Sequence, residues 1–346
     1  MPAAPGAVER WFSLGLYPAI QGVVTPLSNQ LPFALLDVLS VLALVGVGAT
    51  MVHAVRVARR TKRVAPVLGG LGHLAAAAAC VYLVFLALWG LNYRRVSMAE
   101  RLVVEPGAPA PESVVQLGLD AATQLNALYE RAHRSGWRRA PWEDANLQRA
   151  FADVQRELSD APPAVPGRLK PTLFGVYFRW TSVDGMINPF GLEVLANPDL
   201  LPFERPFIAA HEWAHLAGYA NEAEASFVGW LACVRADVEA QYSGWLSLYW
   251  QVRGEVSQDE RARLSGALDA GPRRDVEAVA ARLRRGEWPW LQNAGWRMYD
   301  QYLKANRVEE GIRSYGAVLT LILRARFNEG WAPVRRDPPG DRSHGQ

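Results

Sequence analysis

The chain has 346 residues, of which 50% are apolar and 21% are charged, with 37 Lys and Arg against 34 Asp and Glu. This apolar content excludes a wholly disordered chain, and the near balance of charge excludes a strongly basic nucleic-acid-binding protein. Two cysteines are too few for a disulfide framework. The length predicts two or three structural units, and the mean hydropathy of −0.04 conceals two parts of different character.

The first thirty residues form a segment of their own. Residues 11–30 carry no charge, Pro18 and Pro26 interrupt them, and Arg10 is the one basic residue before them. A cleaved signal peptide has cations followed by an uninterrupted apolar stretch, so we do not expect one here. We expect residues 1–30 to form an interfacial or re-entrant segment, with a third membrane helix as the alternative.

Two long apolar runs follow within residues 31–95. The run Leu31–Val55 contains a single charged residue, Asp37, and the run Leu68–Leu91 contains none. Each run is long enough to cross a hydrocarbon core of about 30 Å. Two buried helices of a soluble protein are the alternative, but such helices rarely extend so far without charge. The sequence therefore predicts two transmembrane helices, with the lipid bilayer as a partner.

The segment between the two runs is strongly basic. Residues 56–63 contain five cations and no acid. Short cytoplasmic loops of membrane proteins are enriched in Lys and Arg. We therefore expect residues 56–63 in the cytoplasm, both termini outside it, and a multi-pass protein whose large C-terminal domain is extracytoplasmic. Trp89 lies where the aromatic belt of the second helix would be.

Residues 96–331 have the composition of a soluble domain, which we expect to be mainly α with a small β element. Helical periodicity of the apolar residues covers 113–134, 143–158, 206–217, 222–240, 257–268, 273–285, 290–304 and 309–326. Aromatic and β-branched residues, with Gly and Pro between them, predict extended structure over 173–180 and 185–194. Residues 332–346 are rich in Pro, Arg, Asp, Gly and Ser, and we expect a disordered tail there.

The sequence His211-Glu212-Trp-Ala-His215 is an HExxH motif. Pro206 is typical of the first turn of a helix and an apolar turn follows it, which places the motif on a helix. Two histidines four residues apart lie on one helical face and can hold one Zn²⁺. Glu212 lies beside them, where it can act as a general base on water activated by the metal.

A catalytic zinc site needs a third protein ligand. Gly218 can end the helix and Asn221 can cap a second helix, so that a carboxylate in its first turn meets the histidines. We assign Glu222 as this ligand; Glu224, Asn221 or a more distant group are the alternatives. Residues 222 and 224 point about 200° apart on a helix, and the small neighbours of Glu222 leave room for helix packing. Glu224 has apolar neighbours, and we expect it either to be buried and paired or to lie at a helix edge, where it can orient a ligand from behind.

Beyond these patterns, the chain resembles a bacterial membrane family catalogued as domain of unknown function 3810. The segments that carry the resemblance are spread over most of the chain: Leu31-Pro-Phe-Ala34, Trp89-Gly-Leu-Asn-Tyr-Arg94, Asn188-Pro-Phe-Gly-Leu-Glu193, the HExxH segment with Glu222-Ala-Glu224-Ala-Ser226-Phe227, and Gly311-Ile-Arg-Ser-Tyr-Gly316. More broadly, HExxH followed by Glu222 is similar to gluzincin metallopeptidases, with a shorter gap from His215 to Glu222 than most of them show. The family carries no established substrate, so the resemblance implies fold and metal more than activity.

The resemblance to gluzincins implies further site residues. In those enzymes an extended edge strand beside the catalytic helix binds substrate backbone, and its counterparts here are Gly185, Asn188, Phe190 and Glu193. Oxyanion stabilisation in them often comes from a Tyr or His outside the motif, which makes Tyr315 and Tyr302 the candidates. The family usually has Asn where this chain has Ser226, and we expect Ser226 to contact the metal ligands from behind.

These observations predict a gluzincin-like zinc-metallopeptidase domain, anchored in the bacterial cytoplasmic membrane by an N-terminal transmembrane helical hairpin. The expected function is hydrolysis of a peptide or protein substrate by metal-activated water, with Glu212 as general base and Zn²⁺ as cofactor. The alternative is a catalytically inactive, zinc-stabilised membrane scaffold that binds a protein partner. No nucleic-acid partner is expected, and the sequence does not determine the oligomeric state.

Overall fold

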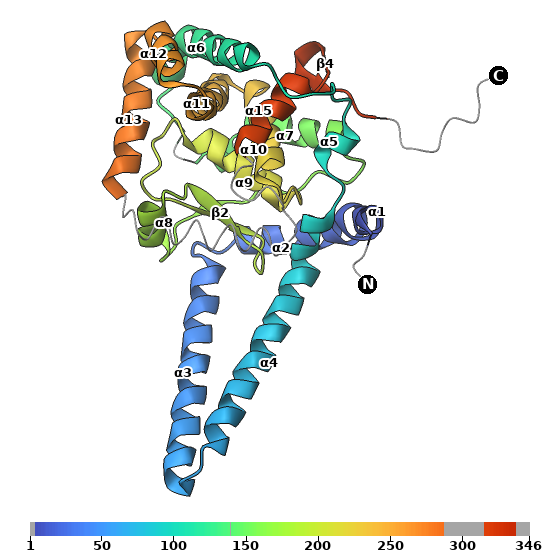
Figure 1. The fold of residues 1–346 in the computed structure, drawn as a ribbon, viewed down its shortest axis with the longest axis vertical. Coiled ribbons are helices and arrows are strands. Elements are labelled where there is room, and N and C mark those ends of the chain that lie inside the picture. The colour runs from blue at the N-terminus through green and yellow to red at the C-terminus, as the bar shows by residue number, and fades with distance from the viewer. Residues whose placement is uncertain (1–3, 139, 287–314, 337–346) are drawn as a thin grey trace, which may run out of the picture.

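The computed structural model describes residues 4–138, 140–286 and 315–336. Figure 1 shows a mainly helical domain from which two long helices project, with a shorter helical segment across its base. The N-terminal elements are α1 (Pro5–Val8), the π-helix η1 (Glu9–Leu16) and α2 (Tyr17–Asn29), and the projecting helices are α3 (Leu35–Thr61) and α4 (Ala65–Leu88). The described part of the chain is therefore mainly α with small sheets, as the sequence predicts.

The helical segment formed by α1, η1 and α2 lies against the domain, and the side of α2 that faces the domain is polar. Tyr17, Gln21 and Thr25 are buried and, being four residues apart, lie on one face. They donate hydrogen bonds of 2.6, 2.7 and 2.8 Å to backbone oxygens of the domain. The exposed apolar residues of the segment are Trp11, Leu16, Val23 and Leu27. This segment thus runs along the domain rather than parallel to α3 and α4 (Figure 1).

α3 and α4 pack on each other and, apart from their ends next to the domain, stand clear of it (Figure 1). Their most apolar windows have mean hydropathies of 2.2 and 2.1 and are 0% and 6% buried. The two helices approach closely at Gly70, where a Cβ atom would lie 3.0 Å from Ala54 Cβ. The basic residues 56–63 lie at the end of the hairpin far from the domain. As predicted, both helices are long and apolar enough to cross a membrane.

The domain contains ten of the described α-helices and three short 3-10 turns. The α-helices are α5 (Met98–Arg101), α6 (Pro111–Arg134), α7 (Ala145–Leu158), α8 (Gly175–Thr181), α9 (Arg205–Leu216), α10 (Glu222–Val234), α11 (Val238–Glu255), α12 (Gln258–Ala267), α13 (Ala270–Gly286) and α15 (Tyr315–Arg324). The 3-10 turns are η2 (Gly90–Arg94), η3 (Pro141–Glu143) and η5 (Glu329–Trp331).

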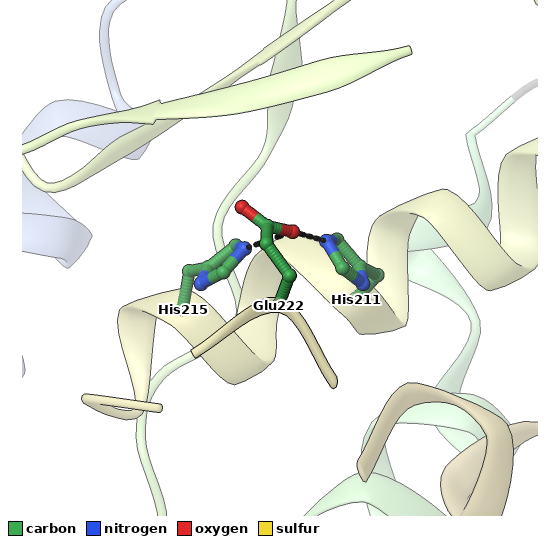
Figure 2. A group of neighbouring side chains, drawn as sticks. All are labelled: His211, His215 and Glu222. Carbon is green, nitrogen blue, oxygen red and sulfur yellow. Dashed lines mark ion pairs between the residues drawn. The ribbon is translucent and has the colours of Figure 1, made fainter. Parts of the chain in front are cut away.

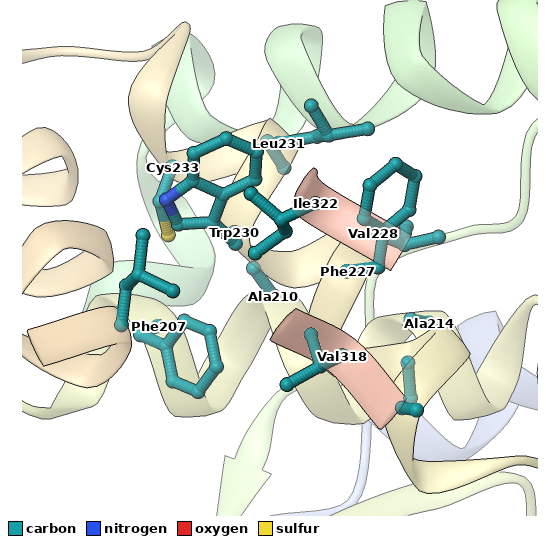
Figure 3. Packing of buried hydrophobic residues seen from close by; sticks show 14 of the residues in the cluster. Phe207, Ala210, Ala214, Phe227, Val228, Trp230, Leu231, Cys233, Val318 and Ile322 are labelled. Carbon is teal, nitrogen blue, oxygen red and sulfur yellow. The ribbon is translucent and has the colours of Figure 1, made fainter. Parts of the chain in front are cut away.

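The core of the domain is built around α10. Residues 223–233 of this helix are buried without interruption, and a helix that is apolar all round needs neighbours on every side. α10 packs against α7, α9, α11 and α15. Figure 3 shows apolar side chains of α9, α10 and α15, among them Phe207, Trp230 and Ile322, in this core. The helix that carries the HExxH motif is thus held against a rigid, buried neighbour.

Five short strands accompany the helices: β1 (Leu169–Lys170), β2 (Gly185–Asn188), β3 (Glu193–Ala196), β4 (Phe327–Asn328) and β5 (Ala332–Pro333). The first three form a sheet in the order β1-β3-β2, with β3 parallel to β1 and antiparallel to β2. β2 is therefore an edge strand, and both β2 and β3 contact α9. The prediction of extended structure over 185–194 is confirmed for residues 185–188 and 193–194, whereas residues 189–192 form the turn between the two strands.

The structure corrects three predictions of local structure. Residues 175–181 form α8 instead of a strand, because Phe174 and Phe178 are four residues apart and pack on one side of a helix. The segment 222–240, predicted as one helix, contains α10 and the first residues of α11. The rest of α11 was not predicted, because its buried residues are spread around the helix and form no single apolar face. Residues 332–336 are not disordered, since their backbone pairs with β4 and with residues 101–103. The predicted helix 290–304 lies outside the described residues.

The N-terminal segments and the domain share one hydrophobic core. Phe12, Tyr17, Phe85 and Trp89 belong to the same cluster of buried residues as the side chains of α9 and α10. The boundaries expected near residues 30 and 95 therefore mark changes in composition, but the segments on either side of them pack in the same hydrophobic core.

Candidate metal centre

α9 carries the HExxH motif. His211 and His215 are one helical turn apart, and the centroids of their imidazole rings are 4.8 Å apart. The helix ends at a turn in which Gly218 has a φ of +84°, a left-handed conformation that glycine adopts without strain. The side chain of Asn221 then accepts hydrogen bonds from two backbone N–H groups in the first turn of α10. This local geometry directs the start of α10 back toward the two histidines.

His211, His215 and Glu222 converge on one point (Figure 2). Glu222 Oε2 lies 3.3 Å from His211 Nε2 and 3.5 Å from His215 Nε2. Tetrahedral ligands at about 2.0–2.1 Å from a zinc ion lie roughly 3.3 Å from one another, so the observed spacing fits such an ion. Two imidazole nitrogens and one carboxylate oxygen also form the donor set of catalytic zinc centres. These three side chains can therefore hold a divalent metal such as Zn²⁺.

The charges in this cluster stabilise one another. Burial opposes ionisation of Glu222, but the charges and hydrogen bonds of His215 and His211 outweigh it and hold the Glu222 pKa well below its usual range. Burial also opposes the charge on His215, but Glu222 and Glu212 outweigh it and raise the pKa of His215 to about 9. The Glu222 carboxylate is thus ionised and can neutralise a cation, whether a proton on the histidines or a metal ion.

Hydrogen bonds at the other ring nitrogens orient both imidazoles. His215 Nδ1 lies 2.7 Å from the backbone oxygen of Tyr219. Because a carbonyl oxygen only accepts, Nδ1 carries the proton of neutral His215 and Nε2 keeps its lone pair for a metal. His211 Nδ1 lies 3.3 Å from Ser226 Oγ. Ser226 therefore lies behind His211, in the position that the sequence analysis expected, and such contacts fix the orientation of metal ligands.

Glu212 lies buried beside the histidines, and its Oε2 has no hydrogen-bond partner among the described residues. The pKa of Glu212 is raised, mainly because burial disfavours the ionised carboxylate. The charges of His211 and His215 act to lower this pKa, but the negative charges of Glu222 and Asp184 act to raise it. A buried polar atom without a partner is costly. Its position next to a potential metal site suits a group that exchanges protons with water.

The first residue of β2 contacts this carboxylate. A Cβ atom on Gly185 would lie 2.7 Å from Glu212 Oε1, so any larger residue would force the strand or the carboxylate to move. Figure 2 shows a strand of the sheet crossing above the three candidate ligands. Of the residues expected to bind substrate backbone, Gly185 is thus adjacent to the candidate base, and Phe190 is half-buried in the turn between β2 and β3.

The side chains of Asn188 and Glu193 are not available to a substrate, and Glu193 lies on the central strand β3 instead of the edge, which corrects the role expected for Glu193. Both side chains are buried, and Glu193 forms a 2.8 Å ion pair with Lys170. Glu193 also accepts hydrogen bonds from Asn188 Nδ2 and from the backbone N–H groups of Leu35 and Leu36. A buried carboxylate needs such partners. These two residues therefore join the sheet to the start of α3.

Glu224 is buried and paired, which is one of the two environments expected for it, and its partner lies outside the metal centre, which corrects the role of orienting a ligand. Its Oε1 accepts a hydrogen bond from the backbone N–H of Met98, and both groups are buried. Glu222 and Glu224 point to different sides of α10, as two steps of about 100° require. The side of Glu224 faces the chain segment that follows α4, so this carboxylate secures the start of α5.

Three side chains near the apolar helices hold the C-terminal end of α9. Trp89, Tyr17 and Arg95 donate hydrogen bonds of 2.9, 2.6 and 3.2 Å to the backbone oxygens of residues 215, 216 and 218. The last carbonyl groups of a helix have no partner within it, and these donors satisfy them. No pattern in the sequence indicates these hydrogen bonds, and Trp89, which we expected in an aromatic belt, has a buried side chain.

No pattern in the sequence indicates the cluster of charged side chains formed by Arg282, Asp184 and Glu204 next to β2. Arg282 of α13 forms ion pairs of 2.9 Å with Asp184 and 2.7 Å with Glu204. Burial raises the pKa of Asp184, while the charges of Arg282 and His211 act to lower it. These pairs tie α13 to the residue before Gly185 and to the start of α9.

The two tyrosines proposed for oxyanion stabilisation are not placed. Tyr315 is the first residue of α15, and its side chain is outside the described part of the structure. Tyr302 lies outside the described residues altogether. Their role stays a prediction.

Residues 12–323 match the family model described as "Protein of unknown function (DUF3810)". The chain belongs to this family. The match includes both apolar helices, the whole of the metal centre and nearly all of α15. No curated protein and no solved structure matches the chain. The description of this family names no activity, so the evidence on function lies in the site itself.

Proposed function

We propose that this DUF3810 protein is a membrane-anchored, zinc-dependent peptidase. The observation that carries the proposal is the convergence of His211, His215 and Glu222. Beside them lies Glu212, a buried carboxylate whose Oε2 has no partner among the described residues. Three protein ligands leave one position open, which is typical of catalytic zinc sites and not of closed structural ones.

The proposed reaction is hydrolysis of a peptide bond. When bound, Zn²⁺ supplies Lewis-acid chemistry that polarises a carbonyl group and lowers the pKa of water toward about 7. Glu212 takes a proton from the attacking water and passes it to the leaving amine. Burial raises the Glu212 pKa and so brings it nearer to neutral pH, where an acid–base group is most effective.

Substrate backbone is proposed to bind along β2. This strand pairs with β3 on one side only, and among the described residues no strand pairs with its other side. An extended peptide can add to such an edge through backbone hydrogen bonds. A peptide bound there would pass Gly185 and so approach the Glu212 carboxylate.

The roles are tested on the full-length protein purified in detergent. Wild type should bind about one zinc per chain and hydrolyse peptides. Glu212→Gln should keep the zinc and lose hydrolysis, because the base is not a ligand, whereas His211→Ala and His215→Ala should lose the zinc. Wild type that binds no zinc, or equal zinc loss in all three variants, would contradict these roles. Proteins that accumulate in cells carrying Glu212→Gln would identify the substrate.

A non-catalytic role is the second candidate. Glu212 and His215 are only 3% and 7% exposed, and restricted access favours a zinc ion that stabilises structure. In this case the protein would be a zinc-stabilised membrane scaffold for a protein partner. Protein that is loaded with zinc but shows no hydrolysis dependent on Glu212 would favour this role over the peptidase.

The membrane topology is part of the proposal. Five cations within residues 56–63 lie at the far end of the α3–α4 hairpin, and such a loop is retained in the cytoplasm. The domain with the metal centre would then be extracytoplasmic. A reporter fused after Arg63 should report a cytoplasmic position and one fused at the C-terminus an extracytoplasmic position; the reverse pattern would contradict the topology.

A further inference from the structure

α8 presents an exposed apolar face. Leu173, in the turn just before it, and Val176, Tyr177 and Trp180 within it are all exposed, with Leu173 at 73%. Their spacing of three, four and seven residues puts them on one side of the helix. On the other side Phe178 is fully buried and packs in a small cluster with Ala34 and Leu195. An apolar face that covers several neighbouring side chains marks a contact with a partner or a membrane.

The position of this face is set by contacts with the start of α3. Asp37, in the first turn of α3, accepts a 2.6 Å hydrogen bond from Thr172 Oγ1 and a 3.0 Å bond from the backbone N–H of Leu173. Ala34, which precedes α3, packs against Phe178. α8 therefore lies beside the point at which α3 leaves the domain, on the side from which α3 and α4 project (Figure 1).

A second apolar face lies along the same base of the domain. α2 turns its polar side chains toward the domain, and Leu16, at the end of η1, lies with Val23 and Leu27 on the exposed side of the segment. Residues 11–36 carry no charge, so no ionised side chain in this stretch opposes contact with lipid. Interfacial helices bury an apolar face of this kind about 5–10 Å into the boundary between headgroups and acyl chains.

We propose that α8 and the α1–η1–α2 segment together seat the domain in the interfacial layer of the bilayer that α3 and α4 cross. This inference rests on the proposed membrane crossing and goes beyond it, because a hairpin alone would leave both faces in water. The occupant is lipid, since the faces adjoin the start of a helix that is itself apolar enough to span the membrane. Only residues 182–184 separate α8 from β2. The first residue of β2, Gly185, lies against Glu212, so the seated face adjoins the strand beside the candidate metal centre.

The test uses full-length protein reconstituted in vesicles of phosphatidylcholine and phosphatidylglycerol. Cys80→Ala removes the exposed native thiol, and Cys233 is buried. Single cysteines at Leu173, Tyr177 and Val23 then carry a nitroxide label, whose collision rates with oxygen and with a water-soluble nickel chelate are compared. Leu44 in α3 is the control for the bilayer interior. Exposed Gln116 of α6, on the far side of the domain, is the control for water.

The labels at residues 173, 177 and 23 should give oxygen-to-nickel collision ratios between those of the two controls. Ratios equal to that of the water control, with residue 44 in the bilayer, would overturn the inference and leave the membrane anchor standing. A label at residue 44 that is accessible to nickel would instead overturn the anchor. Spin–spin broadening at residue 173 that disappears on dilution with unlabelled protein would show a second copy on this face and would also overturn the inference.

Discussion

Glu222 and Glu224 are two residues apart but have different contacts, which allows a direct test of the third ligand. Glu222 contacts both histidines, whereas Glu224 accepts a hydrogen bond from the backbone of Met98. Glu222→Ala should therefore abolish tight zinc binding. Glu224→Ala should leave zinc binding nearly unchanged and should lower the stability of the fold.

The size of each effect follows from these contacts. Groups that only orient a ligand change metal affinity by about 10–100-fold, so loss of the Glu222 carboxylate should cost more than about 100-fold. Glu224→Ala leaves the buried N–H of Met98 without its acceptor, which should lower the free energy of unfolding by about 1–3 kcal/mol. Its zinc affinity should change by less than about tenfold, since Glu224 touches neither histidine.

The assay is competition for zinc with a chromophoric chelator, on full-length protein in detergent. Thermal unfolding of the metal-free variants reports the stability of the fold. Glu255→Ala is the control for loss of an acidic charge, because Glu255 is exposed at the end of α11. A loss of zinc affinity that is equal in both variants, or greater for Glu224→Ala, would refute the assignment of Glu222 as a ligand.

Three further predictions follow from single contacts. Gly185→Ala should lower peptide turnover by up to about 100-fold with zinc retained, because the added Cβ displaces Glu212 by a fraction of an ångström or more. Since a metal needs neutral His215, whose pKa is raised to about 9, zinc binding should release a proton. Zinc affinity should then rise roughly tenfold per pH unit from neutral pH to about pH 9, measured by titration in buffers of different ionisation enthalpy. Lys170→Met should destabilise the fold by about 3–5 kcal/mol in thermal or denaturant unfolding, because it leaves the Glu193 charge buried and unpaired.

Two of these predictions have a control variant in the chain, and the prediction on proton release has a result that would contradict it. Gly254→Ala adds a methyl group where no atom lies within 4 Å, so its turnover should match wild type; equal loss in both glycine variants would contradict the role of the Gly185 contact. Zinc binding that releases no proton near neutral pH would refute the assigned charge of His215. Arg335→Met breaks an exposed pair with Asp160 and should cost only about 0–1 kcal/mol; a similar cost for Lys170→Met would show that burial of its pair is not decisive.

The centre of the site follows from local sequence. The spacing of His211 and His215 places both on one face of α9, and Gly218 and Asn221 predict the turn and the cap that bring Glu222 toward them. The two apolar helices likewise follow from composition and length. All these features depend on residues within about one or two elements of each other, so helix geometry and capping are sufficient to predict them.

The surroundings of the site were decided by tertiary structure. The hydrogen bonds of Trp89 with the end of α9 and of Glu224 with Met98 each join residues 126 positions apart, and such a pair leaves no periodic pattern in the sequence. The strand residues Asn188 and Glu193 show the same limit, because their partners include Lys170 and the start of α3. A spacing in the sequence determines which face of a helix or strand a side chain occupies, but only the packing of distant segments determines what that face meets.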